Sequence, residues 1–263
     1  MRTIYFAALV SVALAPGLAL ADSPFDGTWK ANLNAVNFSK KPDVYLLKDG
    51  MYSCKTCTPP YTVKADGTDQ PVSGHPGFDT VAIKVVDAHT VEQTNKKAGK
   101  TVYTETDTIS SDGKMDDITF TDSSNTKGPP VTGKLTAKQV VAGPAGSNPV
   151  SGSWITTSVG NLSDNAITIT FKTDGDMLTM TSPTGDSYTA KMDGTQAPFT
   201  GNPDISNVSV KKAGTRTLIV TYSRDGKVTS VRHLTVSSDG KSMKVSSHNA
   251  MNGQTTSWTD EKI

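Results

Sequence analysis

The chain has two cysteines, and they lie three residues apart in the motif Cys54-Lys-Thr-Cys57. A pair at this spacing can be a local structural disulfide, a redox-active pair or part of a metal site. Redox catalysis needs the first cysteine at the start of a helix, where the helix dipole lowers the thiol pKa, but Thr58-Pro-Pro60 after the pair predicts a turn. We therefore expect a structural disulfide in an exported chain. Reduced or metal-bound cysteines and a redox-catalytic pair are the alternatives.

Other residue types that support catalysis show no useful spacing. The four histidines, at positions 75, 89, 233 and 248, do not fall into a metal-ligand pattern, and His75 and His89 lie near predicted turns where we expect them to be solvated. No Gly-x-Ser-x-Gly elbow is present, and the Asp-Gly pairs lack the alternating oxygen ligands of a calcium loop. The sequence thus predicts a protein that is not an enzyme, with no catalytic residues, no metal site and no cofactor.

Arg232 is the strongest candidate for a ligand contact. Residues 227–236 alternate as in a strand, and Arg232 shares one side with Leu234 and Val236, which predicts that it points inward. A guanidinium buried alone is costly, so an inward arginine implies a carboxylate partner. That partner is either a ligand or the protein itself. An internal salt bridge and an outward-facing side chain are the structural alternatives.

Most of the chain occurs twice. Residues 61–118 align with residues 188–245 at a constant offset of 127, including the motifs Asp-Gly-Thr and Ser-Ser-Asp-Gly-Lys. Upstream, Gly27-Thr-Trp29 matches Gly152-Ser-Trp154 at an offset of 125. The repeated unit is much longer than the roughly 20 to 50 residues of solenoid or propeller repeats, and each copy is large enough to form its own core. The two tryptophans are expected to be core residues.

The ends and boundaries of the repeats define the predicted domains. Residues 1–21 have the basic start, apolar run and Ala19-Leu-Ala21 ending of a cleavable export signal. The first barrel repeat is predicted at 22–141, a Gly- and Pro-rich linker at 142–149 and the second barrel repeat at 150–263. We expect no transmembrane segment in the mature chain, which would be exported to the periplasm or secreted.

Composition and strand patterns indicate an all-β protein. Without Arg2 the mature chain has 25 basic and 25 acidic residues and no basic stripe, which argues against a nucleic-acid partner. Short runs rich in Val, Ile and Thr alternate with Asp-Gly turns such as Asp193-Gly194, as in hairpin-linked strands. In the second repeat the predicted strands include 166–172, 177–181, 207–212 and 227–236. Each repeat therefore predicts an antiparallel up-and-down meander that closes into a β-barrel, because closure removes the two exposed sheet edges.

Several short motifs resemble the calycins, the group of small antiparallel barrels that contains lipocalins and fatty-acid-binding proteins. Gly27-Thr-Trp29 is similar to the Gly-x-Trp opening strand of that group, and residues 217–234 with Asp239-Gly-Lys241 resemble its late strands. The pattern Trp-x-x-Asn-x-x-x-x-x-Phe-Ser at residues 29–39 looks closest to a bacterial group of exported lipocalin-like proteins. The resemblance implies that Arg232 faces a cavity and receives a ligand carboxylate.

Two functions from different classes fit these features. The first is an exported, non-enzymatic binding protein that holds a small apolar or amphipathic ligand inside one or both barrels. The second is a structural or interaction protein of the cell envelope, with filled barrels and a protein partner that the sequence leaves unidentified. A ligand cavity favours the first and filled interiors favour the second.

Overall fold

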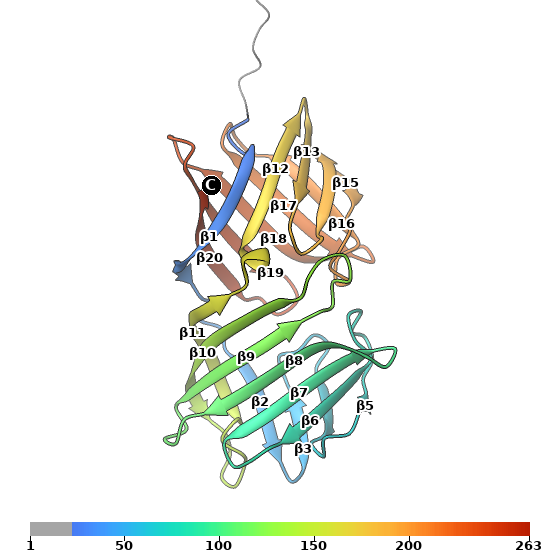
Figure 1. Cartoon of the computed structure of the whole chain (residues 1–263), viewed down its shortest axis with the longest axis vertical. Coiled ribbons are helices and arrows are strands. Elements are labelled where there is room, and N and C mark those ends of the chain that lie inside the picture. The colour runs from blue at the N-terminus through green and yellow to red at the C-terminus, as the bar shows by residue number, and fades with distance from the viewer. Residues whose placement is uncertain (1–22) are drawn as a thin grey trace, which may run out of the picture.

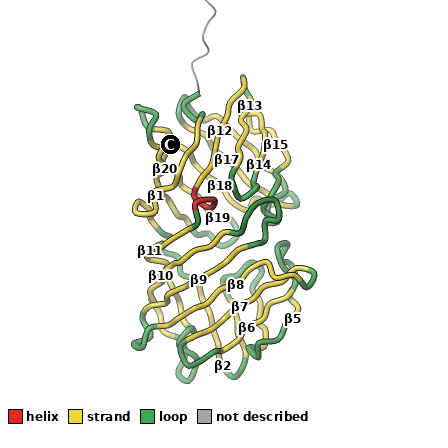
Figure 2. The backbone as a smooth tube through the Cα atoms, in the orientation of Figure 1, coloured by secondary structure: helices red, strands yellow, loops and turns green. Residues whose placement is uncertain are grey.

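Two ten-stranded antiparallel sheets make up the molecule, and each curves into a nearly closed barrel. The computed structural model describes residues 23–263, so the predicted export signal at 1–21 lies outside the described residues. Strands dominate and turns connect them, with one short helix at the junction of the barrels (Figure 2). The predicted fold class, two tandem β-barrels, is confirmed.

The first barrel has the strand order β4-β3-β2-β11-β10-β9-β8-β7-β6-β5. Its strands are β2 (Asp43–Lys48), β3 (Met51–Cys54), β4 (Tyr61–Lys64), β5 (Gln70–Pro71), β6 (Thr80–Val85), β7 (Thr90–Lys97), β8 (Lys100–Ile109), β9 (Met115–Asp122), β10 (Val131–Ala142) and β11 (Gly152–Leu162).

The second barrel has the order β14-β13-β12-β1-β20-β19-β18-β17-β16-β15. Its strands are β1 (Gly27–Asn37), β12 (Thr168–Asp174), β13 (Met177–Thr181), β14 (Ser187–Lys191), β15 (Asp193–Pro198), β16 (Asn207–Lys212), β17 (Thr217–Arg224), β18 (Lys227–Val236), β19 (Ser242–Asn249) and β20 (Thr255–Lys262). The helix α1 (Asp164–Ile167) precedes β12, where the sequence predicted the start of a strand.

The two repeats exchange their first strands. Strand β1, the first strand of the first repeat, pairs with β12 and β20 of the second barrel. Strand β11, its counterpart in the second repeat, pairs with β2 and β10 of the first barrel. Figure 1 shows the exchange directly: the blue β1 lies among the yellow and red strands of the second barrel. Each barrel is therefore complete only when both repeats contribute to it.

This exchange corrects the predicted domain boundaries. The division into 22–141 and 150–263 places β1 and β11 in the wrong barrels. Residues 142–149, predicted to link the barrels, belong instead to the hairpin turn between β10 and β11, which are paired neighbours. The amide of Asn148 donates to the carbonyl of Leu47, so this turn packs on the first barrel. The chain crosses between barrels at residues 38–42 and again at residues 163–167.

Each barrel has its own apolar core, and each core includes a tryptophan from the other repeat. Trp29 is fully buried in the second core, and its indole Nε1 donates to the carbonyl of Phe25 at 2.8 Å. Trp154 is buried in the first core, and its Nε1 donates to the carbonyl of Val150 at 2.9 Å. The expectation that both tryptophans are core residues is confirmed, and the matching hydrogen bonds show that the two exchanged strands have equivalent sites.

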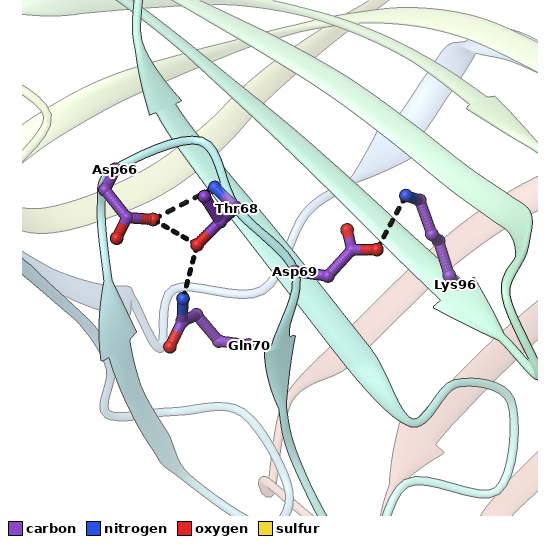
Figure 3. A network of polar contacts seen from close by, with 5 residues as sticks. All are labelled: Asp66, Thr68, Asp69, Gln70 and Lys96. Carbon is purple, nitrogen blue, oxygen red and sulfur yellow. Dashed lines mark hydrogen bonds and ion pairs between the residues drawn. The ribbon is translucent and has the colours of Figure 1, made fainter.

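Hydrogen bonds across the seam nearly close each sheet. In the second barrel, Ser187 and Thr200 exchange two backbone hydrogen bonds, both of 2.9 Å, and in the first barrel Asp66 bridges Lys84. Figure 3 shows the side chains that hold the loop at the seam of the first barrel. The Oδ1 of Asp66 accepts from the amide and the hydroxyl of Thr68, and Lys96 forms an ion pair with Asp69 at 2.8 Å.

Among residues 23–263, no helix has the length and hydrophobicity that crossing a membrane requires.

Candidate functional site

A cavity of about 750 Å³ lies where the two barrels meet. The first barrel contributes residues of β2, the end of β3, residues 56–59 and residues within 74–78. The second barrel contributes residues of β17, β18 and β19 and of the loops before β16 and after β19. Contacts between the barrels fix this arrangement. Asn125 donates to Asp186 at 2.9 Å, and Gln254 donates to Asp43 at 3.1 Å. The cavity is therefore a property of the pair of barrels and not of either one alone.

Arg232 lines the cavity from the second barrel. It is on β18, between Val220 of β17 and Ser247 of β19, and its neighbours Leu234 and Val236 are buried in the core. The guanidinium carbon is 5.1 Å from the ring centroid of Tyr222 and 6.0 Å from that of Trp258. Attraction to the faces of two aromatic rings stabilises the cation and holds it in place. The inward direction predicted from the strand alternation is confirmed.

Among the described residues, no carboxylate oxygen lies within 4.0 Å of a guanidinium nitrogen of Arg232, so it forms no ion pair. Its Nε is buried and has no hydrogen-bond partner. Burial raises the pKa of Asp260 to about 6, opposed by a hydrogen bond from Trp258 and by the charge of Arg232. The internal salt bridge considered from the sequence is thus not formed within residues 23–263. The charge of Arg232 still acts on the carboxyls of Asp186 and Asp260, so two acidic groups lie near it without direct contact.

Three more polar side chains line the cavity: Asp204 and Arg224 of the second barrel and His75 of the first. Burial raises the pKa of Asp204, and the nearby charges of Arg224 and His75 oppose this rise. Arg224 also forms an ion pair with Asp225 at 3.5 Å. His75 lies against Phe78, with ring centroids 4.4 Å apart and nearly parallel planes. The cavity wall therefore holds both acidic and basic groups, and within the described residues Lys227 and Arg232 are lining cations that form no ion pair.

The disulfide lies in the wall of the cavity. Cys54 and Cys57 are joined, which confirms the structural prediction, and both line the site. Cys54 is buried in the first core at the end of β3, and the amide of Cys57 donates to its sulfur at 3.1 Å. The sequence could place the cysteines in a turn, but only the packing of the two barrels brings that turn into the same cavity wall as Arg232.

The first barrel has acidic groups where the second has Arg232. Glu105 occupies the matching position of the repeat, and the hydroxyl of Tyr103 donates to it. Burial raises the pKa of Glu105 and of Asp107, and it raises that of Asp116 to about 7. None of these three carboxyls forms an ion pair within the described residues. The two copies therefore differ at this position: the first barrel holds buried carboxyls whose raised pKa favours the protonated form, and the second holds a guanidinium.

The histidines show where the sequence reasoning was incomplete. His75 was expected to be solvated, but its Nε2 is buried without a hydrogen-bond partner, and the side chain lines the cavity. His89 lies on the turn between β6 and β7 and has a buried Nδ1, whereas His233 and His248 are exposed. Gly74 and Pro76, which flank His75, predicted only a turn, so no signal in the sequence distinguished His75 from the other histidines. Within residues 23–263, no group of three or more potential ligands is arranged to hold a metal ion.

Comparisons with known proteins identify no family for this chain. No protein-family model matches the sequence, and no curated protein matches it. Among solved structures, BamB from Moraxella catarrhalis is similar over 88% of this chain and 96% of its own, with 8% sequence identity and a TM-score of 0.15. A TM-score this low carries no argument about fold or function. The structure thus defines the class as a two-barrel β protein, and the function must be argued from the site.

Proposed function

We propose that this chain is an exported, non-enzymatic binding protein that holds a small anionic, amphipathic molecule in the cavity between its barrels. The observation that carries the proposal is Arg232, an inward-pointing cation without a carboxylate partner at the wall of that cavity. A bound anion would provide the partner that the protein does not supply. Burying this guanidinium would otherwise be costly.

The size and lining of the cavity support a ligand with an apolar body. Sites for small molecules usually measure about 300 to 1,000 Å³ and combine apolar walls with a few oriented polar groups. This cavity measures about 750 Å³, and its walls include Tyr45, Phe78 and Ile205 besides the disulfide. An anionic group at Arg232 with an apolar body along these walls fits both features. Export follows from the predicted signal and is consistent with a disulfide.

The experiment compares two fluorescent probes that differ in one group. 1-Anilinonaphthalene-8-sulfonate carries an anionic sulfonate, and N-phenyl-1-naphthylamine is the same ring system without it. Both are titrated against the wild-type protein, Arg232→Gln and the control Arg216→Gln, which removes an exposed cation of the same barrel. Thermal unfolding of all three proteins checks that the substitutions leave the fold intact.

We expect Arg232→Gln to weaken binding of the sulfonate about ten- to a hundredfold, which is the value of one hydrogen bond to a charged group. Binding of the uncharged probe should change little, and Arg216→Gln should resemble the wild type for both. Equal affinity of the sulfonate for the wild type and Arg232→Gln would contradict the proposal. Failure of both probes to bind would favour the alternative, a structural or interaction protein of the envelope.

A further inference from the structure

The disulfide fixes a short segment of the cavity wall, residues 54–59, which we call the wall loop. Cys54 is buried at the end of β3, and Cys57 is partly exposed. Every residue of the wall loop except Lys55 lines the cavity. Because the bond joins two residues that are three positions apart, it leaves the chain between them few conformations.

The wall loop is hydrogen-bonded to strand β2. The amide of Lys55 donates to the carbonyl of Val44 at 2.9 Å, and the amide of Val44 donates to the hydroxyl of Thr56 at 3.0 Å. The Thr56 hydroxyl in turn donates to Oδ1 of Asp43 at 3.4 Å. The position of the wall loop therefore determines what Asp43 contacts on the side of the first barrel.

The second barrel reaches the same carboxyl from its β19–β20 loop, residues 250–254. Gln254 donates to Oδ1 of Asp43 at 3.1 Å and to the carbonyl of Lys41 at 3.2 Å, and two other residues of this loop line the cavity. Burial raises the pKa of Asp43, and the hydrogen bonds from Gln254 and Thr56 oppose the rise. One carboxyl oxygen thus accepts hydrogen bonds from both barrels and connects the wall loop to the β19–β20 loop.

The wall loop also packs against a third segment of the cavity wall, residues 74–78. A Cβ added at Gly74 would lie 2.8 Å from Pro59 Cγ, so the two segments are in close contact. Three segments of the wall therefore meet at the wall loop. Since the chain has only two cysteines, their bond is the only disulfide that can hold this junction.

We propose that the disulfide is a redox-sensitive latch on the cavity. In the oxidised protein the wall loop is fixed and the other two segments pack against it. After reduction the wall loop moves, the β19–β20 loop loses its contact through Asp43, and ligand binding weakens. This rests on the proposed function, because it concerns the affinity of the same cavity. It makes Thr56 a positioning residue, which acts on the site through Asp43.

Reduction of the latch is an ordinary thiol–disulfide exchange with a dithiol. One thiolate of the dithiol attacks the sulfur of the partly exposed Cys57, and the bond to Cys54 breaks. The second thiolate of the dithiol then displaces Cys57 and closes a disulfide within the reagent. The two protein sulfurs take up two electrons and two protons and become thiols, and the dithiol is oxidised.

The test measures the affinity of the sulfonate probe with and without dithiothreitol. The proteins are the wild type, the double variant Cys54→Ser with Cys57→Ser, Thr56→Val, Thr56→Ser and the control Thr101→Val, which changes an exposed threonine of the first barrel. Hydrogen exchange at residues 250–254 reports on the β19–β20 loop without any ligand. Hydrogen exchange of β17 shows whether the second barrel stays folded.

In the wild type we expect reduction to weaken binding about three- to tenfold, as it would if the ordered wall loop fell to between about a third and a tenth of the population. Exchange at the β19–β20 loop should accelerate, and that of β17 should not change. The double serine variant should bind like the reduced wild type and should not respond to dithiothreitol. In the oxidised state, Thr56→Val should weaken binding, Thr56→Ser should restore it, and Thr101→Val should resemble the wild type.

Equal affinity of the oxidised and the reduced wild type would overturn the latch, and so would unchanged exchange at the β19–β20 loop. Accelerated exchange of β17 would overturn it as well, because reduction would then act on the whole barrel and not on the cavity wall. Failure of the proposed function is a different result: in the oxidised state, Arg232→Gln would then bind the sulfonate as tightly as the wild type.

Discussion

Replacing Trp29 by alanine tests the strand exchange, because Trp29 belongs to the first repeat and is buried in the second barrel. The side chain is fully buried among core residues of the second barrel, and its indole hydrogen bond to Phe25 measures 2.8 Å. Removing a buried tryptophan costs about 3 to 5 kcal/mol of unfolding free energy through lost burial and the cavity left behind. We therefore expect the second barrel to be destabilised by about this amount, and the first barrel to be affected much less.

Native-state hydrogen exchange followed by mass spectrometry separates the two barrels. A loss of 3 to 5 kcal/mol corresponds to exchange about two to three and a half orders of magnitude faster for amides that exchange by opening of the barrel. The increase should fall on β16–β20 in Trp29→Ala and on β6–β10 in the mirror variant Trp154→Ala. A larger effect of Trp29→Ala on β6–β10 than on β16–β20 would refute the exchange, since that is the result expected if β1 stayed with its own repeat.

Three further predictions concern the acidic interior, the disulfide and the contact between barrels. The pKa of Asp116 is raised from 3.8 to about 7, mainly by burial, so the folded state keeps a proton that the unfolded chain releases. Wild-type stability should therefore fall as the pH rises from about 4 to about 7, and Asp116→Asn should remove up to about 4 kcal/mol of this fall in urea unfolding measured across that range. Replacing Cys54 and Cys57 by serine should lower the free energy of unfolding by about 2 kcal/mol, the value for closing so short a loop, and a reductant should then have no further effect on the midpoint. Gly128→Ala should lower the free energy of unfolding by about 1 to 3 kcal/mol in the same assay, because the added Cβ would lie 2.3 Å from the backbone of Thr184 in the other barrel. The control Gly160→Ala should lower it less, because the nearest atom to its added Cβ is 3.7 Å away.

The elements were largely predictable, because strand patterns and turns are local properties of the chain. The strands at 177–181, 207–212 and 227–236 coincide with β13, β16 and β18, where runs of alternating residues lie between turns. Two elements were not predicted. Strand β15, at Asp193–Pro198, begins with residues that predicted only a turn, and α1 replaces the start of a predicted strand. Short segments with strong turn residues carry too little periodicity to be assigned from the sequence.

The candidate site was only half predictable. The inward direction of Arg232 follows from the period of β18, which is a local pattern. The presence of His75 in the cavity wall depends on where its loop meets the second barrel, and that is a long-range contact. Likewise, the sequence alone shows that one repeat has Glu105 where the other has Arg232. Only the folded barrels show that burial raises the pKa of Glu105 and that Arg232 lies over the ring of Tyr222.

The sequence by itself determined the duplication, the all-β class, the core tryptophans and the disulfide. Only the tertiary structure decided which first strand completes which barrel. Strands β1 and β11 have the same length and both begin with Gly, a hydroxyl residue and Trp, so each fits either site, and local patterns cannot distinguish the two arrangements. Loop closure does not favour the exchange, because β1 pairs with β12 and β20 across far longer stretches of chain than those that separate it from β2 and β10. The choice therefore depends on long-range packing, which places Trp29 in the core of the second barrel and Trp154 in that of the first and which no local pattern encodes.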